Sequence, residues 1–126
     1  MSRCPSSKRE AIILLNMIPE VGCTKIRQLC EKLESPQEIF AQSMEELRSL
    51  SVFTERACQA IFHWEATYDV DHETRLASEA GIRIITLYDD SYPRLLRDIR
   101  DPPICLYVAG SLDALSRYQT TIAMVG

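Results

Sequence analysis

The chain has 126 residues, of which 46% are hydrophobic and 25% are charged, a balance typical of a folded globular protein. Its formal net charge of -4 excludes a broad basic surface for binding nucleic acid, so any contact with phosphate must be local. Five widely spaced cysteines without a CxxC pair argue against a disulfide framework and a zinc site. No apolar run approaches the roughly 20 residues that cross a bilayer. We therefore expect a cytoplasmic protein with no export signal, no membrane segment, no metal and no cofactor.

The first predicted helix runs from Ser7 to Met17. Ser7 and Glu10 have the spacing of a capping box, in which a hydroxyl and a carboxylate bond the free amides at a helix start. Pro19 ends the helix. Because apolar residues crowd all its faces, we expect it to be surrounded by other elements.

Further helices are predicted before residue 81. Capping boxes at 35–38 and 43–46 indicate two short ones. The helix that precedes them has one apolar stripe, formed by Ile26, Leu29, Cys30 and Leu33. From Thr54 another stripe predicts a longer helix, formed by Ala57, Ala60, Ile61, Trp64 and Tyr68. The sequence leaves open whether this helix continues to Ala80 or gives way to a separate one.

The turn between the first two helices, residues 18–26, has the form of a helix-hairpin-helix connector. In that motif small residues let the amides at the second helix's N-terminus approach a DNA phosphate. Gly22, Thr24 and Lys25 are therefore candidate DNA-binding residues. Glu20, however, stands where the motif usually has a glycine, and its carboxylate would repel a phosphate. The favoured alternative is a plain connector in which Gly22 only tolerates a positive φ.

Other motifs favour structural roles. The hairpin-like stretch 50–57 has no glycine and is expected to serve packing only. His63 and His72 lack partners at metal-ligand spacing and are expected at the surface. Trp64 and Tyr68 have the helical spacing of core residues.

Charged clusters in the second half also favour structure over chemistry. Asp89-Asp90 is more typical of a turn than of a carboxylate pair for acid and base catalysis. The basic cluster is expected to pair in solvent with Asp98 and Asp101 rather than to hold a phosphate, and to share one side of a short helix. It consists of Arg94, Arg97 and Arg100.

From Gly81 the helical spacing gives way to short apolar runs, which predict strands at 82–87, 105–109 and 120–125. The runs hardly alternate with polar residues, which favours strands covered on both faces, as in a parallel sheet flanked by helices. The last strand runs into Gly126, which has the place of the first glycine of a nucleotide-type loop and is the fourth candidate DNA-binding residue.

Four segments closely resemble the DNA-processing protein A (DprA/Smf) family: GIRIIT at 81–86, YPRLL at 92–96, DPPICLYVAG at 101–110 and IAMVG at 122–126. They occur in the family's order. The helical front resembles the family's sterile-alpha-motif-like (SAM-like) or helix-hairpin-helix-like domain. The implied fold is α/β: an all-α domain at 1–70, then the opening segment of a Rossmann-like domain at 71–126.

The resemblance implies a bacterial cytosolic protein that binds incoming single-stranded DNA in natural transformation, the DNA uptake of competence. It also implies help in loading the recombinase RecA, without catalysis. The family binds DNA in a basic pocket of its Rossmann-like domain and dimerises through later parts of that domain. We therefore expect this chain to stop before its ligand site, with the homodimer contacts in residues absent here. The alternative is a helical protein-interaction module that binds no DNA of its own.

Overall fold

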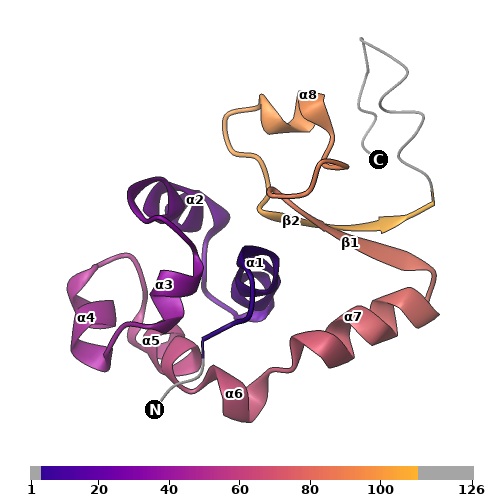
Figure 1. Ribbon diagram of the computed structural model, residues 1–126. Coiled ribbons are helices and arrows are strands. Elements are labelled where there is room, and N and C mark those ends of the chain that lie inside the picture. The colour runs from indigo at the N-terminus through magenta and orange to yellow at the C-terminus, as the bar shows by residue number, and fades with distance from the viewer. Residues whose placement is uncertain (1–3, 111–126) are drawn as a thin grey trace.

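A computed structural model describes residues 4–110, which form a helical part followed by a pair of strands (Figure 1). The helices are α1 Lys8–Met17, α2 Cys23–Lys32, α3 Gln37–Phe40, α4 Met44–Ser49, α5 Glu55–Phe62, α6 Trp64–Thr67, α7 Val70–Glu79 and α8 Arg94–Arg97. The strands are β1 Ile82–Thr86 and β2 Cys105–Ala109. The predicted strand at 120–125 lies outside the described residues. The chain is thus a mixed α/β protein, and α7 begins at the domain boundary predicted near residue 70.

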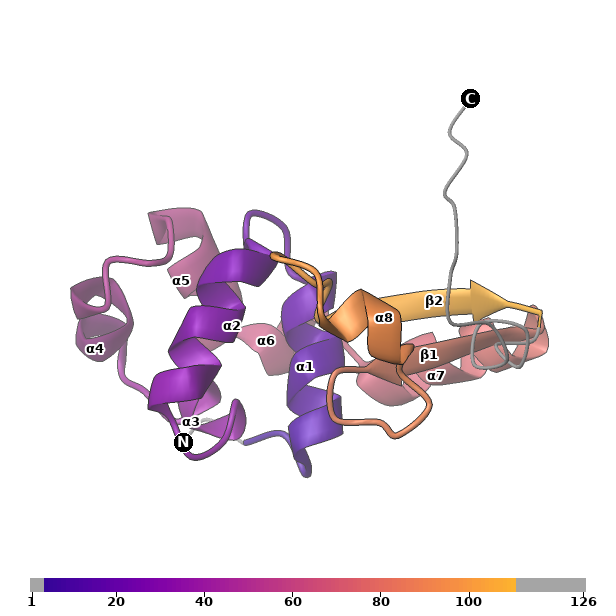
Figure 2. The same cartoon turned by 90° about the horizontal axis from the view of Figure 1, so that it is seen from above.

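Helix α1 is the centre of the molecule, as its sequence predicts. Five successive residues, from Ala11 to Leu15, are buried, and α1 contacts α3, α7 and both strands. Figure 2 shows α1 between helices α2 to α6 on one side and the strands with α7 and α8 on the other. Only half of its predicted capping box forms. The Ser7 hydroxyl accepts from the Glu10 amide at 3.1 Å, whereas the Glu10 carboxylate accepts from the amide of Ser6, at 2.9 Å.

The other two predicted capping boxes have different outcomes. At α4 the box is complete: the Ser43 hydroxyl accepts from the amide of Glu46, and the Glu46 carboxylate accepts from the amide of Ser43. At α3 the predicted box does not form, because the Ser35 hydroxyl accepts from the amide of Gln37, at 3.2 Å, and not from that of Glu38. The short helices therefore start where the sequence predicts, with different caps.

The long segment after Thr54 is broken into α5, α6 and α7. The backbone is extended at Tyr68, the C-cap of α6, and at Asp69, the N-cap of α7. The Asp69 carboxylate then accepts from the amide of His72 at 3.1 Å and so starts α7. The question that the sequence leaves open is settled in favour of a separate last helix.

The two strands pair antiparallel, with Ile82 opposite Ala109 and Thr86 opposite Cys105. The predicted parallel arrangement is therefore wrong for this pair. The only helix between the strands is α8, a single turn, which is too short to carry the chain back along β1 as the helix of a parallel crossover does. The unbroken apolar run of β1 has another cause. Ile84 and Ile85 point to opposite faces and both are buried, because α1 and α7 lie on one side of the sheet and α8 on the other (Figure 1).

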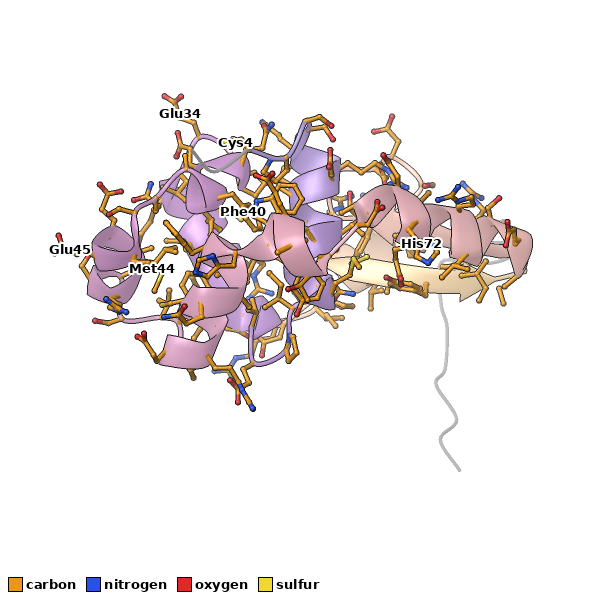
Figure 3. The ribbon with its side chains drawn as sticks, turned by 90° about the horizontal axis from the view of Figure 1, so that it is seen from below. Cys4, Glu34, Phe40, Met44, Glu45 and His72 are labelled. Atoms are coloured by element: carbon orange, nitrogen blue, oxygen red, sulfur yellow. The ribbon has the colours of Figure 1, made fainter. Side chains whose placement is uncertain are left out.

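One hydrophobic cluster joins the helices to the sheet. It contains the buried residues of α1 together with Ile84, Ile104 and Cys105 from the strand region. Phe40 and Trp64 meet edge to face in it, with ring centroids 5.9 Å apart, which confirms the predicted core position of Trp64. Figure 3 shows Phe40 inside the helical part, whereas His72 lies on the surface of α7.

Residues 4–110 have neither a membrane-spanning helix nor a cluster of metal-binding side chains. None of their helices combines the length and the apolar character that a membrane crossing needs. Nor do they contain a group of three side chains able to hold a metal ion.

Candidate nucleic-acid interface

The two hairpins of the helical part lie together and form an open groove of about 660 Å³, here called the hairpin groove. The first hairpin joins α1 to α2, and the second joins α4 to α5. The groove is lined by Glu20, Gly22, Thr24, Lys25, Ser51, Val52, Phe53 and Thr54. Three of the four candidate residues predicted from the sequence thus share one site. The fourth, Gly126, lies outside the described residues.

Each hairpin contains one non-glycine residue in the left-handed region: Glu20 with φ 67° and Ser51 with φ 58°. Gly22 has φ -78°, so the interpretation that it tolerates a positive φ is wrong. The left-handed position is Glu20 itself, where the helix-hairpin-helix motif usually has its glycine. A side chain in this conformation costs roughly 1–2 kcal/mol. The first hairpin therefore has a left-handed residue at the position where the motif usually has its glycine.

The Glu20 carboxylate is held by the second hairpin. Its Oε2 accepts from the Thr54 hydroxyl at 3.1 Å, and its Oε1 lies 3.8 Å from Nη1 of Arg56. The Thr54 hydroxyl also accepts from the amide of Ala57, as the N-cap of α5. The groove lining thus contains one carboxylate, Glu20, and one cation, Lys25, while Arg56 pairs with Glu20 from outside the lining. The repulsion expected from Glu20 is partly balanced by Arg56.

The prediction that the second hairpin serves packing only is incomplete. Val52 and Phe53 do pack against the core. All four residues from Ser51 to Thr54 also line the groove, however. A residue pattern within 50–57 gives no sign of this role, because it depends on a contact with the other hairpin.

The first turn of α2 differs from that of α5 because no side chain caps it. Its N-cap is Gly22, without a side-chain hydrogen bond, so its amides are not bonded by a capping side chain. Lys25 is exposed beside them. Amides at such a helix start, with a cation near them, favour an anion.

Thr24 has a partner from the other end of the described chain. Its hydroxyl donates to Oδ1 of Asp101 at 3.3 Å. Arg27, one turn further along α2, donates through Nη2 to the same oxygen at 3.1 Å and to the carbonyl of Arg100 at 3.0 Å. The sequence does not indicate Arg27 as a site residue, because Arg27 and Asp101 are too far apart in the sequence for a helix or turn pattern to connect them.

The basic cluster does not pair as predicted. Asp101 binds Arg27 and not the cluster. The guanidinium of Arg97 donates to two backbone carbonyls of the turn after β1, at 2.8 and 3.4 Å, and lies 5.1 Å from the ring centroid of Tyr92. The cluster does not share one helix either, since α8 ends before its third member. All three members, Arg94, Arg97 and Arg100, are exposed.

Asp89 forms the predicted turn. Its Oδ2 accepts from the amide of Thr86 at 2.7 Å, and its Oδ1 lies 3.4 Å from Nε of Arg9. A carboxylate used in this way orders the end of β1. The interpretation of Asp89-Asp90 as a turn is confirmed.

A family model described as DNA recombination-mediator protein A matches residues 83–126, which include most of β1, all of α8 and all of β2. No curated protein and no solved structure matches the chain. The resemblance drawn from the sequence is thereby confirmed for residues 83–126, which are similar to the DNA-processing protein A family.

Proposed function

We propose that this protein acts in DNA recombination by binding incoming single-stranded DNA and assisting the loading of RecA in natural transformation, without catalysing a reaction. The match of residues 83–126 to DNA recombination-mediator protein A supports the proposal most strongly. The proposal assumes a SAM-like or helix-hairpin-helix-like front, a Rossmann-like second part, and a homodimer.

Within this function we assign the hairpin groove an auxiliary contact with the DNA backbone. The uncapped amides of α2, the Thr24 hydroxyl and the exposed Lys25 support the assignment. A Cβ built on Gly22 would have no atom within 4 Å, so the backbone there is open to an approaching strand. Because the whole chain is acidic, the contact is expected to be weak and to depend on salt.

The test is the binding of a fluorescently labelled oligothymidylate to the full chain, measured by anisotropy over a series of salt concentrations. Lys25→Gln should weaken binding about two- to fivefold, as for an exposed charge, and lower the salt slope by about 0.7, the value for one phosphate contact. Lys32→Gln removes the same charge at the far end of α2 and is the matched control. Equal effects of the two substitutions would refute the assignment of the groove.

The alternative, a protein-interaction module without DNA binding, also has a structural observation in its favour. The helical part packs on its own strand pair through one shared cluster, and Arg27 joins it to Asp101. If the full chain failed to bind the oligonucleotide even at low salt, this alternative would replace the groove proposal.

A further inference from the structure

The contact between Asp101 and α2 places a carboxylate at the candidate DNA contact. Asp101 Oδ1 accepts from both the Thr24 hydroxyl and Nη2 of Arg27, at 3.3 and 3.1 Å. Thr24 lines the hairpin groove, beside Lys25. The acidic side chain comes from the segment that leads into β2, so one part of the molecule closes a site on another.

A carboxylate oxygen and a phosphate oxygen use the same donors. A hydroxyl and a guanidinium bind either oxyanion by charge-assisted hydrogen bonds of similar length. While Asp101 is in place, Lys25, Arg27 and Asp101 together carry a charge of about +1; without the carboxylate they carry about +2. The contact therefore removes two donors and one net positive charge from the turn.

The contact between Asp101 and Arg27 is exposed enough to be released. The Asp101 side chain is 51% exposed and that of Arg27 is 22% exposed, so water competes for the ion pair. Nη1 of Arg27 is buried and has no hydrogen-bond partner among the described residues. The neighbouring Pro102 is buried, which anchors the backbone and leaves the rotation of the Asp101 side chain as the means of release.

We infer that Asp101 is an autoinhibitory group that competes with nucleic-acid phosphate for Thr24 and Arg27. The inference rests on the proposed function of the hairpin groove and adds its regulation. It also makes Arg27 a DNA contact that is available only when Asp101 has moved away.

The experiment compares Asp101→Asn with Asp98→Asn in the full chain, using the labelled oligothymidylate at low salt. Both substitutions remove one negative charge from the same exposed segment, and no contact of the Asp98 side chain is described. Asp101→Asn should bind about two- to fivefold more tightly than Asp98→Asn, the range expected for a half-exposed ion pair. Adding Arg27→Gln to Asp101→Asn should abolish this gain.

The outcomes separate the two proposals. If the wild-type chain binds and Asp101→Asn binds no better than Asp98→Asn, the autoinhibition is refuted and the groove function stands. If no variant binds at low salt, both are refuted. Should Asp101→Asn fail to fold, as judged by circular dichroism, NMR of the wild-type chain gives a second test. The Arg27 Hε resonance should shift as oligothymidylate is added, and an unmoved resonance at saturation would overturn the inference.

Discussion

Arg9 connects the first turn of α1 to Asp89, in the turn that follows β1. Its Nε lies 3.4 Å from the Asp89 carboxylate, and its guanidinium also donates to the carbonyl of Ile84. The same carboxylate accepts from the amide of Thr86, a residue with no exposed surface. One aspartate thus holds the end of β1 and the start of α1 together.

Asp89→Ala should therefore destabilise the protein by about 1–3 kcal/mol, because it leaves the buried Thr86 amide without its acceptor. Urea unfolding followed by circular dichroism measures the change. Asp90→Ala, at the exposed neighbour, should stay within about 0.5 kcal/mol of the wild type. Similar losses in the two variants would contradict the role given to Asp89.

Ser51→Gly should stabilise the protein by about 0.5–1 kcal/mol. Glycine removes the strain of the left-handed conformation at φ 58° in the folded state. It also increases the conformational entropy of the unfolded chain, which offsets only part of this stabilisation. Ser49→Gly is the control with the opposite sign, because Ser49 lies in α4, where glycine is unfavourable. The thermal midpoint should rise for the first variant and fall for the second; a fall in both would show that Ser51 is unstrained.

Asp69→Ala should cost about 0.5–2 kcal/mol, since it removes the N-cap of α7. Asp71→Ala, in the exposed first turn, keeps that cap and should cost less. Amide exchange provides the local readout: protection in the first turn of α7 should fall in Asp69→Ala only. Unchanged protection there would argue that packing of α7 on β1 starts the helix by itself.

The protein should lose stability between about pH 9 and pH 11. Burial raises the pKa of the Cys105 thiol from 9.0 to about 11, so above pH 9 the unfolded chain gives up this proton while the folded chain keeps it. The folded state then binds more protons than the unfolded state, and the free energy of unfolding falls as pH rises.

The measurement is the urea midpoint as a function of pH. In Cys105→Ala the decline above pH 9 should be shallower but not absent, because burial also raises the pKa of Cys30 and Cys58. A decline of equal slope in the variant and the wild type would exclude Cys105 as its source.

Local sequence signals predicted the helical part well. The spacing of Ile26, Leu29 and Cys30 found α2, and Ser43 with Glu46 found the start of α4, because both depend on residues within one or two turns. The antiparallel pairing could not be found in this way. The apolar run of β1 reports burial on both faces, and burial on both faces does not fix strand direction.

Only the residues that the first hairpin contributes to the candidate site were predicted from the sequence. Gly22, Thr24 and Lys25 follow from the hairpin motif, whereas Thr54 and Arg27 act through partners that are distant in the sequence. No spacing rule connects such pairs before the fold brings them together.

The cluster shared by helices and strands has a consequence for dissection of the protein. Since Ile84 and Cys105 complete the apolar surroundings of α1, an excised helical part would present a bare, water-exposed flank. Such a truncation is expected to self-associate, and an apparent loss of ligand binding in it would then report aggregation.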